Sequence, residues 1–227
     1  MRIGVGQLTS TSNPLLNGIK ASKLIQKAHS AGCKVLFLPE ASDYIAGSPA
    51  ETVSLAQPIM ESDFFHELRK ALNDYPLYLS VGVHEPGNFS PSQVRNTLLW
   101  ISPQGQVLNR YQKMHLFDAD VPNGPILRES KSVEPGKVFP ELIDVPDSPF
   151  IIGPQICYDI RFPETANELS ARGASIIVFP SAFTVKTGQA HWTTLNKARA
   201  IDNQCFVISA GQVGQHDEAG KRVSYGH

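Results

Sequence analysis

The chain has 227 residues, of which 41% are hydrophobic and 18% are charged, a composition that is typical of globular proteins and excludes a disordered one. Twenty basic and 21 acidic side chains leave a formal charge of −1, so no basic field favours nucleic acid or an anionic membrane. No apolar run approaches the ~18 residues of a membrane-spanning helix, and residues 1–8 indicate a strand rather than a signal peptide. Three widely spaced cysteines are too few for a disulfide scaffold. We therefore expect a soluble cytoplasmic, or also mitochondrial, protein.

In the first half of the chain, short apolar runs alternate with segments of helical periodicity. Apolar residues at helical spacing predict one helix over 21–28, stopped by Gly32, and a second over 64–72, closed by Pro76. A turn signal at 102–105 predicts that the last two strands of this half form an antiparallel hairpin. The expected strands are Ile3–Leu8, Val35–Leu38, Leu77–Val83, Thr97–Ile101 and Val107–Tyr111.

The second half begins with a loop-rich stretch, 118–136, and then repeats the alternation. Helices are expected over about 163–172 and 191–203. Pro154 cannot donate a backbone hydrogen bond, so it predicts an edge or a bulge at that point. The expected strands are Phe150–Ile156, Ser175–Phe179 and Phe206–Ser209.

Residues 32–41 align without gaps on residues 173–182, and each segment reads as a helix stop, a buried strand and a proline that ends the strand. The repeat predicts two halves related by approximate symmetry, each with a mixed sheet and outer helices. It is also compatible with two unrelated helix–strand units. Because no linker or charge block divides the chain, we expect residues 1–227 to form a single domain.

Cys157 follows an apolar strand and precedes a helix that Pro163 can start. A thiol at such a turn lies near the positive end of the helix dipole, which favours the thiolate of a nucleophile. The alternative is a buried structural cysteine. Cys33 and Cys205 begin apolar strands, and we interpret them as core residues.

Glu40 directly follows a buried strand, at the end where ligands bind in open α/β sheets. Burial raises the pKa of a carboxyl group toward working pH, so Glu40 can act as a general base beside a thiol, or it can simply cap the next segment. Lys113 ends a hairpin strand and can stabilise an oxyanion, although a lysine there is usually solvated. The same doubt applies to Glu129.

Three segments together carry a specific resemblance. Residues 38–41 (LPEA), 111–118 (YQKMHLFD) and 157–164 (CYDIRFPE) resemble, in order and spacing, the catalytic motifs of the nitrilase family of carbon–nitrogen hydrolases. The resemblance runs over the whole chain and implies an α/β fold of four layers, an α-β-β-α sandwich of two mixed sheets with helices outside. It also implies a homodimer that pairs through its helices, and an enzyme for which we expect no cofactor.

The resemblance implies a catalytic triad of Glu40, Lys113 and Cys157, with Glu129 orienting Lys113 and the substrate amide. We expect the Cys157 thiolate to attack an amide carbonyl and form a thioester, with Lys113 and the backbone N–H of Tyr158 holding the oxyanion. Glu40 then protonates the departing amine and activates the water that opens the thioester. The histidines show no ligand spacing, so no metal site is expected.

Within the family, residues 40–52, 121–124, 127–130 and 183–188 look like those of the deaminated glutathione amidases, which implies a 2-oxo dicarboxylate amide as the substrate. Arg161 can bind its carboxylate, or instead pair with Glu164. Thr187 can add a hydrogen bond, while Phe183 and Tyr44 can form walls or a lid. His191-Trp192 is expected to pack the second sheet rather than touch substrate.

One departure from the family and three alternatives stand beside this interpretation. Relatives continue into another strand and a C-terminal tail, which would leave a sheet edge and part of the dimer surface uncovered if they were truly absent. The alternatives are an ω-amidase acting on 2-oxoglutaramate, a catalytically inactive interaction scaffold, and a glycosidase that uses Glu40 and Glu129 without a thiol.

Overall fold

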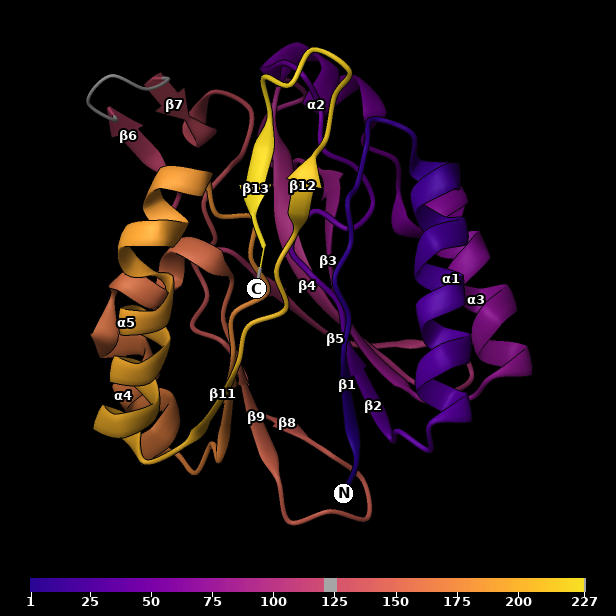
Figure 1. Cartoon of the computed structure of the whole chain (residues 1–227), viewed down its shortest axis with the longest axis vertical. Helices are drawn as coiled ribbons and strands as arrows, with labels where there is room; N and C mark the ends of the chain where they lie inside the picture. Colours follow the sequence, from indigo (N-terminus) through magenta and orange to yellow (C-terminus); the bar gives the residue numbers. More distant parts are fainter. Residues whose placement is uncertain (121–125, 227) are drawn as a thin grey trace.

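The computed structural model describes residues 1–120 and 126–226 and places two β-sheets face to face between two layers of helices (Figure 1). The first sheet has the order β1-β2-β3-β4-β5, in which β1, β2 and β3 are parallel and β3, β4 and β5 are antiparallel. Its outer helices are α1 (Pro14–Ser30) and α3 (Asp63–Asp74). The strands are β1 (Ile3–Val5), β2 (Val35–Phe37), β3 (Tyr78–Pro86), β4 (Val94–Ile101) and β5 (Val107–Gln112).

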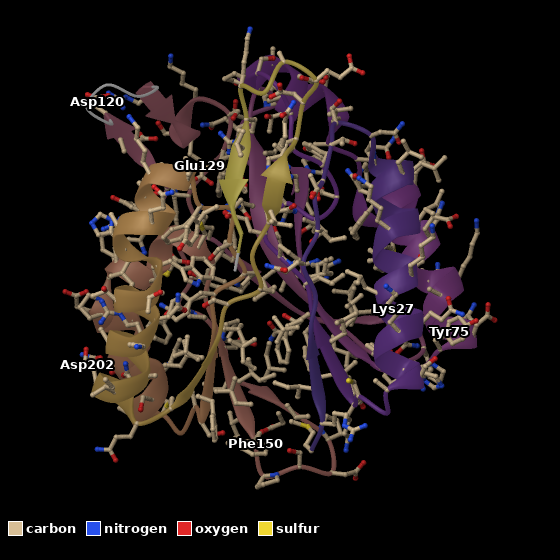
Figure 2. The ribbon with its side chains drawn as sticks, viewed as in Figure 1. Lys27, Tyr75, Asp120, Glu129, Phe150 and Asp202 are labelled. Atoms are coloured by element: carbon tan, nitrogen blue, oxygen red, sulfur yellow. The ribbon has the colours of Figure 1, made fainter. Side chains whose placement is uncertain are left out.

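The second sheet has the order β11-β10-β9-β8, with β9, β10 and β11 parallel and β8 antiparallel to β9. Helices α4 (Pro163–Ala171) and α5 (Val185–Asn203) cover its outer face. Lys27 and Asp202 mark the two opposite outer surfaces in Figure 2. The strands are β8 (Ile143–Asp144), β9 (Ile151–Pro154), β10 (Ile176–Val178) and β11 (Phe206–Ile208).

The protein has one hydrophobic core between the two sheets and another between the first sheet and helices α1 and α3. Side chains that alternate along the strands of the first sheet contribute to both. In β2, Val35 and Phe37 pack between the two sheets, whereas Leu36 packs toward α1 and α3, so the strand is buried on both faces. Full burial of each such side chain stabilises the fold by roughly 1.5–3 kcal/mol. The four-layer α-β-β-α architecture expected from the sequence is confirmed.

The internal repeat corresponds to matching units in the two sheets. Gly32 and Gly173 both adopt a positive φ, 73° and 109°. Gly32 lies between the end of α1 and the start of β2, and Gly173 lies between the end of α4 and the start of β10. The strands β1, β2 and β3 are parallel in that order, as are β9, β10 and β11. Left-handed backbone of this kind is cheap only for glycine, which explains why the same residue recurs.

Several boundaries differ from the expectation. Helix α1 begins at Pro14 because the Asn13 side chain accepts a hydrogen bond from the Leu16 N–H at 3.0 Å and caps it. Helix α5 begins at Val185, ahead of the expected start. Short elements that were not expected are α2 (Pro49–Leu55) and the hairpins β6 (Asp118–Asp120)–β7 (Ile126–Arg128) and β12 (Val213–Gln215)–β13 (Val223–Tyr225).

The expectation at Pro154 is confirmed in part: the strand has no bulge there, but Pro154 lies at a local edge, beyond the residues that pair with β8. Pro154 pairs in regular register with Val178, within a strand that has neighbours on both sides. The N–H of Gln155 donates to Val178, so the nitrogen of Pro154 faces the other side, beyond the last residue pair with β8. A missing donor costs nothing where no partner strand reaches it.

No helix of the described residues is long and apolar enough to cross a membrane.

Candidate active site

A cleft of about 1290 Å³ opens between the segments that follow strands of the two sheets. Every site residue expected from the sequence contributes to its lining. These residues are Glu40, Tyr44, Lys113, Glu129, Cys157, Tyr158, Arg161, Phe183 and Thr187. Figure 2 shows Glu129 inside the molecule, between the two helical layers.

Glu40 reaches the cleft because the chain stays paired with β3 after β2 ends. The N–H of Gly82 donates to Pro39 at 3.0 Å, and the N–H of Ser42 donates to Gly82 at 2.8 Å. A Cβ atom at position 82 would lie only 2.6 Å from the Cα of Glu40. The absence of a side chain at Gly82 therefore allows this close backbone approach, which fixes the carboxylate.

The Lys113 ammonium lies between two carboxylates. Its Nζ donates to Glu40 Oε1 at 2.8 Å and to Glu129 at 3.0 and 2.9 Å. The Lys113 side chain is only 2% exposed, so the alternative of a solvated surface lysine is excluded. A buried ammonium of this kind needs charged partners, and two converge on it here.

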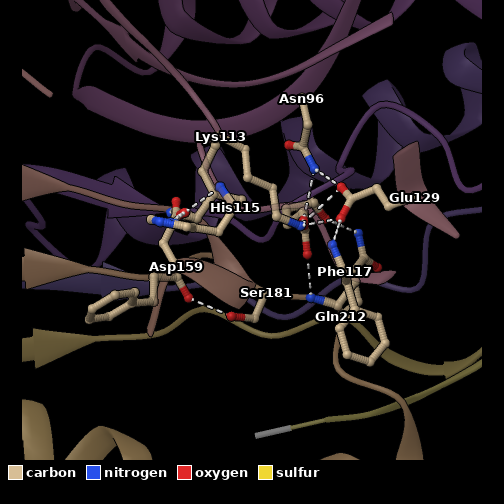
Figure 3. Close-up of polar contacts among 12 residues, drawn as sticks. Asn96, Lys113, His115, Phe117, Glu129, Asp159, Ser181 and Gln212 are labelled. Carbon is tan, nitrogen blue, oxygen red and sulfur yellow. Dashed lines mark hydrogen bonds and ion pairs between the residues drawn. The ribbon is translucent and has the colours of Figure 1, made fainter. Parts of the chain in front are cut away.

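Three further donors orient the carboxylates (Figure 3). Asn96 Nδ2 donates to Glu40 Oε1 at 2.8 Å and to Glu129 Oε1 at 3.2 Å, so one amide connects both. The backbone N–H of Ala182 donates to Glu40 Oε2 at 2.9 Å, and that of Phe117 donates to Glu129 at 2.6 Å. Glu40 is thus held by groups from both halves of the molecule.

The protonation states follow from this arrangement. Burial opposes the charge on Lys113, but Glu129 and Glu40 outweigh it and raise its pKa well above the usual value. Burial also opposes the charge on Glu40, but Lys113 and the hydrogen bonds outweigh it and lower its pKa. The expectation that burial would raise the pKa of Glu40 is therefore wrong, because the ammonium is in direct contact.

Cys157 begins the short 3-10 helix η3 (Cys157–Arg161) with a φ of 45°, in the left-handed region that non-glycine residues rarely adopt. Asp159, which is fully buried, holds this turn. It accepts hydrogen bonds from Ile156 N–H at 2.9 Å, from the Tyr111 hydroxyl at 2.8 Å and from His115 Nδ1 at 2.7 Å. These contacts maintain a strained backbone that presents the sulfur to the cleft.

Burial, and then the charge of Glu40, raise the pKa of the Cys157 thiol well above its usual value, while Lys113 opposes them. The expectation that the helix dipole favours a resting thiolate is wrong, because burial of the sulfur, and then the adjacent Glu40 carboxylate, disfavour the thiolate more strongly. In the resting site the proton is on sulfur and the negative charge is on Glu40. The carboxylate is thus ready to accept the thiol proton.

The remaining candidate residues line the cleft around this centre. Arg161 lies 3.0 Å from His191 and extends over the ring of Tyr158; among the described residues it has no ion pair with Glu164. Thr187 Oγ1 lies 2.8 Å from the Thr184 hydroxyl.

The aromatic residues expected near the substrate also have defined packing. The hydroxyl of Tyr44 donates to the Thr52 carbonyl at 2.7 Å, and Phe183 packs edge-on against Trp192. The packing prediction holds for Trp192, which is buried in the core of the second half, but not for the exposed His191. Cys205 packs against the core between the sheets, and Cys33 packs against the core beneath α1 and α3. Both are partly buried, in agreement with their interpretation as core residues.

Sequence reasoning missed Asn96 and the backbone donors of Ala182 and Phe117. Asn96 has a weak signal, because it is an amide close to the apolar run that ends β4, at 98–101. The backbone donors have none, since any residue supplies an N–H.

The motif segment 121–124 lies outside the described residues. Within the described parts of the chain, no group of three His, Cys, Asp or Glu side chains is arranged to hold a metal ion.

The chain is similar to known proteins over nearly its whole length. A family profile described as carbon-nitrogen hydrolase matches residues 2–227. A probable hydrolase, nit2, of Schizosaccharomyces pombe is 42% identical over 224 residues, which cover 98% of this chain and 79% of that protein. The deaminated glutathione amidase of Mus musculus is 39% identical over 228 residues, covering 99% of this chain and 69% of that protein.

Solved structures are similar over 99% of the chain. The Caenorhabditis elegans NitFhit protein superposes with a TM-score of 0.89 at 38% identity, and the match covers 54% of that longer chain. Saccharomyces cerevisiae Nit3, described as a member of the nitrilase superfamily, superposes with a TM-score of 0.81 at 26% identity over 79% of its chain. The chain therefore belongs to the carbon–nitrogen hydrolase family.

Proposed function

We propose that the protein is an amidohydrolase that cleaves deaminated glutathione into 2-oxoglutarate and cysteinylglycine. The proposal is supported by relatives that carry this activity in their names. The observation that carries the chemistry is the arrangement of Lys113 between Glu40 and Glu129, beside a protonated Cys157 in an open cleft. Nucleophile, base and oxyanion donor are then within reach of one carbonyl group.

The first half of the proposed reaction forms a thioester. As the Cys157 sulfur attacks the amide carbonyl carbon, its proton moves to the Glu40 carboxylate. The carbonyl oxygen becomes an oxyanion, which the Lys113 ammonium and the Tyr158 backbone N–H stabilise. Glu40 then gives the proton to the amide nitrogen, the C–N bond breaks, and cysteinylglycine leaves as a neutral amine.

The second half regenerates the site. Glu40 takes a proton from water while the hydroxide attacks the thioester carbonyl, and the same donors hold the second oxyanion. When the C–S bond breaks, the proton returns from Glu40 to the sulfur, and 2-oxoglutarate is released. Glu129 takes no part in these proton transfers; its role is to orient Lys113 and the substrate amide.

Substrate binding is assigned to the part of the cleft around η3 and α5. The Arg161 guanidinium is to bind the 2-oxo acid carboxylate, because it combines a fixed positive charge with two parallel donors. Thr187 supplies a hydroxyl, while Phe183 and Tyr44 form walls. We further propose that the protein is cytoplasmic or mitochondrial and forms a homodimer that pairs through its helices. Light scattering of the purified protein measures its molar mass and so tests the homodimer.

The decisive experiment compares kcat/KM for deaminated glutathione with that for 2-oxoglutaramate, the substrate of the alternative ω-amidase. Both have the same acyl part, so the comparison isolates the departing amine. We expect the higher value for deaminated glutathione. A much higher value for 2-oxoglutaramate would contradict the proposed substrate, and the absence of hydrolysis of both would favour an inactive scaffold.

A further inference from the structure

One buried histidine in the cleft has no role in the reaction described above. His84, on β3, lines the cleft and its side chain is only 10% exposed. Its Nδ1 lies 3.0 Å from Asp43 Oδ1, and its backbone N–H donates to Asp43 Oδ2 at 2.7 Å. The ring of Tyr44 stacks on the imidazole at 4.5 Å between centroids. Asp43 and Tyr44 therefore fix both the position and the plane of the ring.

The second ring nitrogen remains available. Among the described residues, no side chain or backbone group forms a hydrogen bond with Nε2 of His84. Nδ1 is turned to Asp43, so protonation of the ring makes Nε2–H a donor for an acceptor in the cleft. A buried donor that ends in a cleft and lacks a partner in the protein indicates a ligand atom.

The surroundings of His84 favour its cationic form. Burial lowers its pKa, but Asp43, and then Glu40 and Glu129, outweigh burial and raise the pKa above the usual value. The Lys113 ammonium opposes these carboxylates, and the Tyr44 ring facing the imidazole carries no charge because burial holds its hydroxyl protonated. When protonated, the imidazolium is a second positive centre of the cleft, and the neighbouring carboxylates favour that form.

The position of His84 in the cleft indicates which part of the substrate lies next to this side chain. On β3 it lies two residues beyond Gly82, the glycine against which the Glu40 backbone packs. Because Glu40 delivers the proton to the departing nitrogen in the proposed reaction, the departing amine lies on this wall of the cleft. Arg161 belongs to η3, in the other half of the molecule, and is assigned to the acyl part.

We propose that His84, oriented by Asp43, is a specificity-determining residue that binds an oxygen of the departing amine through Nε2–H. The class of substrate it selects is an amide whose departing amine is an amino acid or a peptide, with a carbonyl or carboxylate oxygen near the scissile bond. An amide that releases ammonia has no such oxygen and gains nothing from His84. The inference rests on the proposed function and assigns its preference for a peptide leaving group to one side chain.

The test uses His84→Asn in the full chain, with deaminated glutathione and 2-oxoglutaramate as substrates. The asparagine amide can still donate to Asp43 in place of Nδ1, so the fold is preserved, but the Nε2 donor is lost. We expect kcat/KM for deaminated glutathione to fall about 10- to 100-fold, mainly through KM, as for loss of a charged hydrogen bond. The value for 2-oxoglutaramate should change less than about threefold.

His84→Gln is the matched control, because its amide can restore a donor near the position of Nε2. We expect it to recover part of the loss for deaminated glutathione. In the wild type, KM for deaminated glutathione should rise as the pH passes above the pKa of His84, while KM for 2-oxoglutaramate stays flat. This measurement needs no variant, so a misfolded variant would not leave the inference without a test.

The outcomes separate the two proposals. Equal losses on both substrates in His84→Asn, with a flat KM profile in the wild type, would overturn the role of His84 while leaving the proposed function intact. If wild-type protein hydrolyses neither substrate, the proposed function fails, and the role of His84 fails with it.

Discussion

The Nζ atom of Lys113 lies 2.8 Å from Oε1 of Glu40, and the two side chains are only 2% and 6% exposed. Because Glu129 contacts the same ammonium at 2.9 Å, two negative charges share one positive charge. Burial of the sulfur, and then the charge of Glu40, keep the proton on Cys157, while the Lys113 charge keeps Glu40 ionised and able to accept that proton. The positions of these two residues therefore decide where the catalytic proton rests.

Lys113→Met should destabilise the protein by about 3–5 kcal/mol at neutral pH, because it leaves two carboxylates buried without a counter-ion. In the wild type the lowered pKa of Glu40 gives stability that is present above about pH 4.5 and is lost as the pH falls through the folded pKa. In the variant, burial raises that pKa instead, so stability should increase as the pH falls. Urea unfolding from pH 8 down to about pH 3 measures both slopes, and equal slopes would contradict the charge arrangement.

Glu40→Gln should lower kcat by about 10²–10⁴-fold, since it removes the general base and acid but retains most of the volume of the side chain. The same change should lower the pKa of Cys157, because Glu40 raises it and Lys113 opposes that effect. The pH profile of alkylation by iodoacetamide, with mass mapping of Cys157, measures the shift. An unchanged or higher midpoint would show that the carboxylate does not control the thiol.

Cys157→Ala should abolish turnover by several orders of magnitude while the protein remains folded. Cys33→Ala is the matched control, because Cys33 is a partly buried cysteine that does not line the cleft. Retained activity in Cys157→Ala would favour the glycosidase alternative, which needs only the two carboxylates. Activity and circular dichroism of both variants distinguish loss of chemistry from loss of fold.

Gly82→Ala should reduce both stability and kcat, because the new Cβ would lie 2.6 Å from the Cα of Glu40 and displace the backbone that carries the carboxylate. Gly4→Ala is the control in the same sheet. There the atom nearest to the new Cβ is the end of the Leu36 side chain, at 3.1 Å, which can move, and Ala28 and Cys33 lie farther away at 3.4 and 3.6 Å. Similar kcat values for Gly82→Ala and the wild type would contradict the fixed position of Glu40.

The sequence predicts the fold well where burial imposes a pattern. Strand β2 is recognisable because Val35–Phe37 is buried on both faces, and α3 because its apolar residues repeat along one face. Helix α2 has no buried residue, so no periodicity reveals it. The hairpin β12–β13 is equally hidden, since its strands have three residues each.

The candidate site divides in the same way. Glu40 and Cys157 are noticeable in the sequence because each is a chemically active residue directly after an apolar run. His84 is not, since a single histidine gains meaning only when folding brings Asp43 against it. The pKa directions of Glu40 and Cys157 could not be predicted either, because they depend on an ammonium from a distant segment.

The resting state of Cys157 also bears on how the protein survives oxidants. Peroxide reacts with thiolates, and a cysteine that is only 7% exposed and keeps its proton offers it little to attack. A substrate carbonyl in the cleft, by contrast, draws the proton to Glu40 only as the bond to sulfur forms. The same contact that activates the nucleophile during turnover thus protects it from sulfenic acid formation between turnovers.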